Sequence, residues 1–160
     1  MENKIIIGNV CFIRDLKSEQ ILLLKRSRAP MKGYYTGVGG KTDFYEDIHR
    51  SCLREIKEET GLDVFDLTCK GVLKTIQEGA GSSWILFMYV AEQFSGDLIE
   101  CDEGELRWFS YKQIPTLPMI DFVREILPSI LMDGQFTEGT VRHDADGRVL
   151  EKTLHFIRNS

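Results

Sequence analysis

Residues 40–62 read GKTDFYEDIHRSCLREIKEETGL, and the interpretation of the whole chain depends on this stretch. Apolar residues recur at helical spacing through its second half, at Ile48, Cys52, Leu53 and Ile56. Such a stripe is typical of a helix with one buried face. Gly61 lies where a helix usually ends, because glycine adopts the left-handed C-cap conformation without strain. The sequence therefore predicts a helix that ends at Gly61.

Three glutamates crowd the last turns of this predicted helix. Glu55, Glu58 and Glu59 are three and four positions apart, so their side chains share one face and repel one another. The helix dipole also disfavours negative charge near a helix C-terminus. Taken alone, the cluster is typical of a solvated acidic face, although carboxylates are also the ligands that Mg²⁺ prefers. Gly39 and Gly40 favour the cation site, because glycine lets the backbone approach a ligand closely.

The fixed positions of this stretch match a known signature. Glu46 is predicted to open the helix, where the dipole favours an acid. The matching positions are Gly40, Glu46, Arg54-Glu55-Ile56, Glu58-Glu59 and Gly61-Leu62. The chain therefore resembles the Nudix hydrolases, and residues 40–62 are called the Nudix box below. The resemblance implies an α/β protein, a Nudix-type α/β/α sandwich with a mixed β-sheet. It also implies Mg²⁺-dependent hydrolysis of a nucleoside diphosphate linked to another moiety.

Site roles follow from the resemblance only where this chain has the matching residue. Glu55, Glu58 and Glu59 match the metal-binding carboxylates of the family, and the carbonyl of Gly39 matches a backbone ligand. Arg54 matches the residue that holds a glutamate in place. We therefore expect Arg54, Glu55 and Glu58 to be catalytic, with Mg²⁺ as the cofactor and Mn²⁺ as a possible substitute.

Family members also use a carboxylate from a later loop, either as a metal ligand or as the general base. The acidic loop of this chain covers residues 101–105, just before Trp108. We expect Glu103 to be this catalytic residue because of its spacing to Trp108, and Glu105 is the alternative. A plain solvated turn is the other interpretation of the loop. Arg26 ends a predicted strand, where it either contacts phosphate or is an ordinary solvated strand end.

Weaker similarities point to one branch of the family, the MutT-type oxidised-purine nucleoside triphosphate diphosphatases. They lie in Gln113-Ile114-Pro115, Gly134-Gln135-Phe136 and residues 150–154. In that branch, the positions of Asn9 and Asp121 recognise the purine. By default, Asn9 would instead be a strand residue with internal hydrogen bonds and Asp121 a helix N-cap.

The branch implies that a nucleoside triphosphate is cleaved to a monophosphate and pyrophosphate, with 8-oxo-dGTP sanitisation as the expected role. The alternatives are a Nudix pyrophosphatase for ADP-ribose or another nucleoside diphosphate derivative, and a non-catalytic nucleotide-binding module. Binding modules usually lose acids of the box, whereas this chain keeps all of them. The expected partner is a small-molecule nucleotide, and the protein is expected to be a monomer or homodimer.

Length and composition limit the classes of protein to which this chain can belong. A chain of 160 residues predicts one Nudix hydrolase domain over 1–160. The net charge of −5 argues against binding a nucleic-acid polymer through a basic surface. The four cysteines show neither disulfide nor zinc spacing, and three of them are expected to be small core residues. No signal pattern or long apolar run is visible, so we expect a cytoplasmic protein without membrane contact.

Apolar patterns predict strands on both sides of the helix. The expected strands cover residues 5–13, 20–26, 34–38, 66–77, 83–94, 106–110, 136–142 and 148–156. Pro115 and Pro118 precede a second helix, which buries Ile120, Val123, Leu127, Ile130 and Leu131. Pro128 is expected to kink or split that helix. Partly antiparallel strands with two helices predict a mixed sheet between helical layers.

Overall fold

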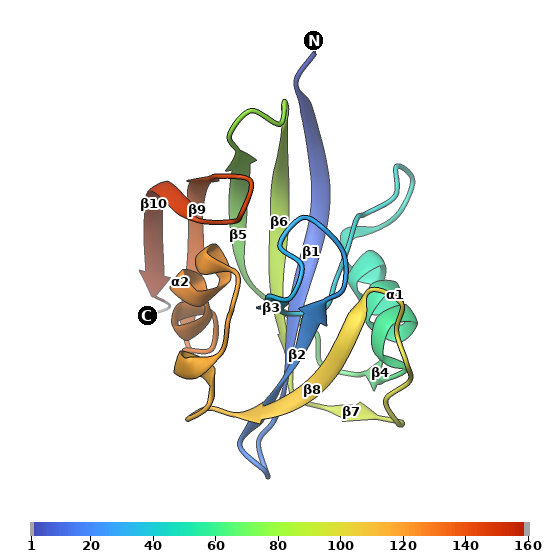
Figure 1. Ribbon diagram of the computed structural model, residues 1–160. Helices are drawn as coiled ribbons and strands as arrows, with labels where there is room; N and C mark the ends of the chain where they lie inside the picture. Colours follow the sequence, from blue (N-terminus) through green and yellow to red (C-terminus); the bar gives the residue numbers. More distant parts are fainter. Residues whose placement is uncertain (1, 159–160) are drawn as a thin grey trace.

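The computed structural model describes residues 2–158 and places one large mixed sheet between two helices (Figure 1). The strand order is β10-β9-β5-β6-β1-β2-β3, and β8 pairs with the other side of β2. The strands are β1 (Lys4–Asp15), β2 (Gln20–Arg26), β3 (Tyr35–Thr36), β4 (Asp63–Val64), β5 (Thr68–Gln77), β6 (Ser82–Ala91), β7 (Phe94–Ser95), β8 (Gly104–Ser110), β9 (Gln135–His143) and β10 (Val149–Arg158). The helices are α1 (Ile48–Thr60), α2 (Asp121–Ile130) and the short 3-10 helix η1 (Ile114–Thr116).

The central strand β1 explains why the sheet needs a helix on each face. Successive side chains of a strand point to opposite faces. Val10 and Phe12 pack in the cluster that contains α2, whereas Cys11 and Ile13 pack in the cluster that contains α1. The continuous apolar run of β1 is therefore buried on both sides. The α/β/α sandwich expected from the sequence is confirmed.

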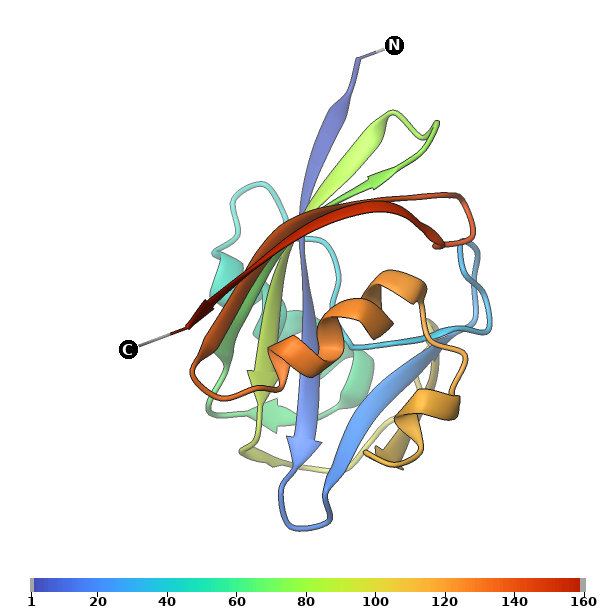
Figure 2. The same ribbon diagram turned by 90° about the vertical axis from the view of Figure 1, so that its left-hand side faces the viewer.

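Strand directions within the sheet are mixed, as expected. β1 runs parallel to β6 and β5 runs parallel to β9, while the other neighbours of the large sheet are antiparallel. The β9–β10 hairpin forms one edge of the sheet and curves past α2 (Figure 2). The strands expected at residues 66–77, 83–94, 136–142 and 148–156 form this hairpin and the β5–β6 hairpin, with bounds shifted by a few residues. The small β4–β7 ladder and η1 were not predicted, because elements this short leave no periodic pattern.

The start of α1 differs from the sequence prediction. Asp47 is the N-cap, and its side chain accepts a hydrogen bond from the Arg50 N–H. Glu46 lies outside the helix, because the shorter aspartate caps better and the longer glutamate reaches back to Arg54. The predicted end is confirmed, since Gly61 is the C-cap with a φ of 81°.

Helix α2 also differs in two details. Pro128 lies inside the helix, which continues to Ile130 without splitting. Proline has no N–H to donate to the carbonyl of residue 124, so the helix passes Pro128 with one hydrogen bond fewer. Asp121 is the first helical residue rather than the N-cap, and the cap position belongs to Ile120. The carboxylate of Asp121 is used by another strand, as described below.

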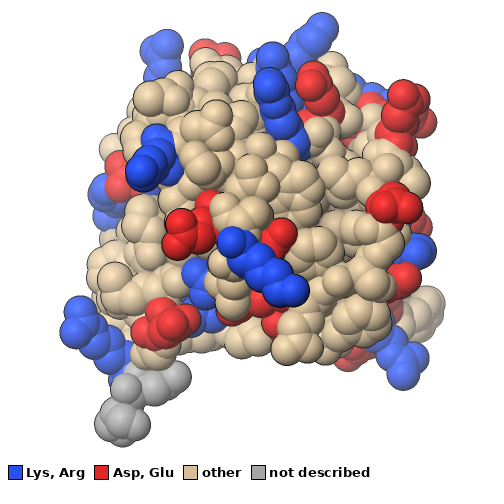
Figure 3. Space-filling model, turned by 90° about the horizontal axis from the view of Figure 1, so that it is seen from below, with Lys and Arg blue, Asp and Glu red and all other residues tan. Residues whose placement is uncertain are grey.

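Two surface properties bear on the predicted partners. None of the helices within residues 2–158 combines the length and apolar character needed to cross a bilayer. On the face seen in Figure 3, acidic and basic side chains are interspersed rather than gathered by sign.

Of the four cysteines, Cys11 and Cys52 are buried, whereas Cys69 is exposed and Cys101 is half-buried. The expectation of three core cysteines was therefore wrong, because Cys69 lies near the start of β5, where the sheet is less covered.

Candidate active site

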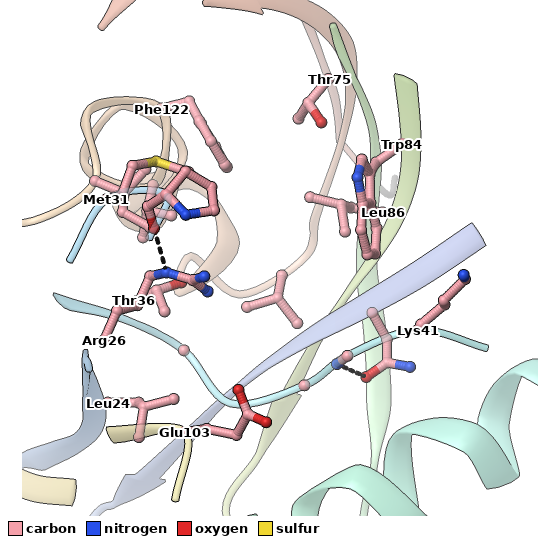
Figure 4. A pocket seen from close by; sticks show the side chains of 18 of the residues that line it. Leu24, Arg26, Met31, Thr36, Lys41, Thr75, Trp84, Leu86, Glu103 and Phe122 are labelled. Atoms are coloured by element: carbon pink, nitrogen blue, oxygen red, sulfur yellow. Dashed lines mark hydrogen bonds between the residues drawn. The ribbon is translucent and has the colours of Figure 1, made fainter. Parts of the chain in front are cut away.

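A cavity of about 460 Å³ opens between β1, the start of α2 and the loop before α1 (Figure 4). Glu55, Glu59 and Glu103 line one part of it. The wall opposite Glu103 includes Thr75 and Phe122, and Trp84 faces Met31 and Phe122 across the space. The cavity thus connects a group of acids to an apolar chamber with aromatic walls.

The acids of α1 differ in burial along the helix. Glu59 is 7% exposed, and burial raises its pKa to about 8. Burial also raises the pKa of Glu55. Glu58 lies further out, with 59% of its side chain exposed. Two of the three glutamates are therefore held where a negative charge is costly without a nearby cation.

Arg54 connects three acids of the Nudix box. Its Nε donates to Glu46 Oε2 at 2.6 Å, and its Nη1 donates to Glu55 Oε1 at 3.0 Å and Glu58 Oε2 at 3.1 Å. The hydrogen bond from Arg54 lowers the pKa of Glu46 to about 2. The structure therefore brings Arg54 onto the predicted metal ligands, as the resemblance implied, and shows that Glu46 anchors the arginine.

The two glycines before α1 fill positions where a side chain would clash. Gly39 has a φ of 153°, and a Cβ atom there would run into the carbonyl of Asn9. A Cβ on Gly40 would lie 2.5 Å from the carboxyl carbon of Glu55. The N–H of Gly39 donates to Glu59 Oε2 at 2.9 Å. Glycine thus allows the loop to lie directly against the two inner glutamates.

Asn9 supports the loop of Gly39 and Gly40 through hydrogen bonds. Its Oδ1 accepts from the Gly40 N–H at 3.3 Å, and its Nδ2 donates to Ser51 Oγ at 3.1 Å. Thr42 Oγ1 donates to the same Ser51 oxygen at 3.0 Å. Asn9 and Ser51 are both buried. Sequence analysis missed the role of Ser51, and the available signal was a polar residue beside the apolar stripe of α1.

We expect Asn9→Ala to lower kcat by about tenfold, because the glycine loop loses a support and Ser51 loses a donor. The loss should be equal for every nucleotide that the protein hydrolyses. Steady-state kinetics with two nucleotides of different base measures this. Ser51→Ala, which leaves the bond between Asn9 and Gly40, serves as the milder control. A loss confined to one base would instead assign Asn9 to base recognition.

The loop carboxylate and the predicted phosphate contact both lie at the cavity. Glu103 lines it, whereas Glu105 lies exposed on β8 in register with Lys25. Arg26 also lines the cavity, and its Nε donates to the Pro30 carbonyl at 2.8 Å. The hydrogen bond from Nε therefore holds the Arg26 guanidinium in the same cavity as the acids.

Asp121 is placed beside the cavity rather than on its surface. Ile120 and Phe122 line the space, but Asp121 itself is not among the lining residues. Its Oδ2 accepts a hydrogen bond from the Val149 N–H at 2.9 Å. The carboxylate therefore ties the start of α2 to β10.

The oxygen donors of the Nudix box are of the kind that suits a hard divalent cation. Within residues 2–158, no three of the His, Cys, Asp and Glu side chains form a ready-made metal group. The reason lies in Arg54, which draws Glu55 and Glu58 to itself, while Gly39 holds Glu59. Carboxylate and carbonyl oxygens are the ligands that Mg²⁺ takes.

Comparisons with known proteins agree with this geometry. The chain matches the NUDIX domain model over residues 6–130. It is 29% identical over 140 residues to YvcI, an uncharacterized Nudix hydrolase of Bacillus subtilis, covering 85% of this chain and 87% of the relative. A crystal structure of a mutator MutT protein from Bacillus halodurans superposes with a TM-score of 0.82 at 28% identity, covering 93% and 97% of the two chains.

Relatives with named substrates differ among themselves. An oxidized purine nucleoside triphosphate hydrolase of Danio rerio is 31% identical over 96 residues, covering 60% of this chain and 62% of the relative. An ADP-ribose pyrophosphatase of Methanocaldococcus jannaschii is 30% identical over 102 residues, covering 63% and 60%. The match to the family model spans most of the chain, whereas the named substrates diverge. This chain belongs to the Nudix hydrolase family and is a pyrophosphohydrolase of nucleotide derivatives.

Proposed function

We propose that the protein hydrolyses a nucleoside triphosphate to a monophosphate and pyrophosphate with Mg²⁺ or Mn²⁺, and that 8-oxo-dGTP is its preferred substrate. The observation that carries this proposal is a cavity that joins acids of the Nudix box to an aromatic chamber. A nucleotide has the same two-part chemistry, an anionic chain and a flat base. Sanitisation of the nucleotide pool is the role that follows.

The acidic end is suited to the phosphate chain. Glu55, Glu58, Glu59 and the Gly39 carbonyl would hold the cation. When bound, a divalent cation supplies positive charge that offsets the negative charge developing on the phosphoryl oxygens. Arg26 lies where it can contact a phosphate oxygen.

Two further groups of the acidic end orient the metal ligands and accept a proton. Arg54 keeps Glu55 and Glu58 oriented through its two Nη1 hydrogen bonds. Glu103 faces the same space and takes the proton of the attacking water as general base.

The apolar end is suited to the base. Trp84 and Phe122 offer aromatic faces, and Leu86 adds an apolar surface beside Trp84 (Figure 4). We propose that Asn9 and Asp121 contribute to substrate binding by holding the two walls of this cavity, Asn9 through the glycine loop and Asp121 through β10. Oxidation at C8 turns the purine N7 from an acceptor into an N–H donor, which a hydrogen-bonding site can distinguish.

The test is a comparison of purified protein on 8-oxo-dGTP, dGTP and ADP-ribose with Mg²⁺. We expect kcat/KM for 8-oxo-dGTP to exceed that for dGTP by about tenfold or more, because a site built around a hydrogen bond rejects an analogue that lacks it. Equal values would leave a general triphosphate diphosphatase. Turnover of ADP-ribose without turnover of any triphosphate would favour the activity named for the Methanocaldococcus jannaschii relative.

A further inference from the structure

The sheet face beneath α2 becomes polar toward one end of the cavity. Thr75 on β5 and His143 on β9 line the cavity, and each is only 4% exposed. Gln77, which pairs with His143 in register, lines it as well. Farther along the same strands the corresponding positions, Leu73 and Val141, are fully buried and apolar. Polar groups in such a layer cost free energy unless they meet a partner.

The hydrogen bond of His143 fixes which ring nitrogen carries the proton. Its Nδ1 lies 2.7 Å from the carbonyl oxygen of Asp144. A carbonyl can only accept, so Nδ1 is the donor and the neutral ring leaves Nε2 as an acceptor. Within residues 2–158, the contact of Nδ1 is the one side-chain hydrogen bond of His143. The ring also packs against Phe122, with centroids 5.3 Å apart and planes tilted by 33°, so its orientation is held from two sides.

The surroundings of His143 suit a base rather than a phosphate. The wall beside His143 is the aromatic ring of Phe122, and Trp84 faces Phe122 across the cavity (Figure 4). Mostly apolar walls with a few fixed polar groups are typical of sites that orient a flat organic ligand. An unengaged acceptor in such a wall matches an N–H donor on the edge of a base.

The histidine comes from a part of the chain beyond the family match. The NUDIX domain model covers residues 6–130, so β9 and β10 lie outside it. These strands extend the sheet next to β5 and carry His143 to the cavity. The hairpin can therefore set a preference that the shared core of the family does not set.

We propose that His143 Nε2 accepts a hydrogen bond from an N–H group on the edge of the nucleobase, so that the β9–β10 hairpin determines base selectivity. This inference rests on the proposed function, because it needs a nucleotide in the cavity. Thr75 and Gln77 flank the same edge and complete its polar side.

The test uses pairs of nucleotides in which one member has an additional N–H donor group: 8-oxo-dGTP with dGTP, which also differ by the C8 carbonyl, dGTP with dITP, and dATP with the triphosphate of 2′-deoxypurine riboside. We expect wild type to discriminate within at least one pair by about a hundredfold in kcat/KM. His143→Phe should reduce that ratio to less than about tenfold while retaining activity on the poorer substrate. His143→Gln, which keeps an acceptor, should retain most of the discrimination.

His155→Phe is the matched control, since it makes the same change on exposed β10, at a hollow on the other side of the sheet from the cavity. It should leave every ratio unchanged, and thermal unfolding should show that all three variants fold. In long-range ¹H–¹⁵N spectra, the Nε2 resonance of His143 should shift when the preferred nucleotide binds. A His143→Phe protein that keeps every wild-type ratio within about twofold would overturn the inference while leaving the proposed function intact.

If wild type hydrolyses none of these nucleotides, the proposed function fails. The role of His143 can then still be tested by measuring nucleotide binding. Calorimetric Kd values for the matched nucleoside monophosphates need no hydrolysis. A ratio within one pair that disappears in His143→Phe supports the acceptor role. An unchanged ratio, or no binding of any member by wild type, overturns it.

Discussion

Replacing Glu58 with glutamine is expected to lower kcat on the order of a thousandfold, because the substitution removes a charged ligand of the proposed cation site. Loss of several kcal/mol of transition-state charge stabilisation corresponds to this factor. Glutamine keeps the shape of the side chain. Since the Glu58 side chain is 59% exposed, the free energy of unfolding of the metal-free protein should change by less than about 0.5 kcal/mol. Steady-state kinetics with Mg²⁺ and urea unfolding with EDTA measure the two quantities.

Glu138→Gln provides the matched control, because it removes the same charge from an exposed position on β9. It should keep wild-type kcat. A Glu58→Gln protein that hydrolyses nucleotides at the wild-type rate would contradict the metal assignment. A large loss of stability would instead indicate that the ion pair between Glu58 and Arg54 is structural.

Without a divalent cation, the protein is expected to lose stability as the pH rises from about 4.5 to 8. Burial raises the pKa of Glu59 to about 8, whereas the unfolded chain ionises this residue near its ordinary value of 4.5. Between the two values the folded state holds a proton that the unfolded state has released, so unfolding becomes easier as the pH rises. The contribution of Glu59 over this window is about 4 kcal/mol. Urea unfolding in EDTA at several pH values measures it.

Glu59→Gln isolates the contribution of this one carboxyl. The variant should be more stable than wild type at pH 8 and similar to it at pH 4.5, because glutamine carries no charge in either state. Mg²⁺ should reduce the pH dependence of wild type, since a bound cation stabilises the ionised carboxylate. Parallel pH profiles for wild type and Glu59→Gln would show that Glu59 ionises normally in the folded protein.

Regular patterns made much of the fold predictable. The stripe of Ile48, Cys52 and Ile56 and the glycine at position 61 predicted α1 and its end, because helical period and capping are local properties. Strand runs such as residues 20–26 predicted β2, since burial on both faces requires a continuous apolar sequence. Element boundaries were less accurate. Glu46, for example, was assigned to the helix, and only the structure shows that its side chain reaches Arg54 instead.

Features that depend on distant contacts could not be predicted. The support of the glycine loop by Asn9 joins residues from β1 and α1, and neither segment alone indicates that the two meet. The same is true of His143, which reaches the cavity only because β9 pairs with β5 in a parallel register. The acidic loop left Glu103 and Glu105 as alternatives, and only the fold shows that Glu103 lines the cavity whereas Glu105, in register with Lys25 on β8, does not.

The most direct test of the central claim is ³¹P NMR of the reaction products. Purified protein is incubated with 8-oxo-dGTP and Mg²⁺, with Glu58→Gln and EDTA as parallel controls. The proposed function predicts resonances of pyrophosphate and the nucleoside monophosphate, and no reaction in either control. Release of orthophosphate with a nucleoside diphosphate would contradict it, as would full activity after exhaustive chelation.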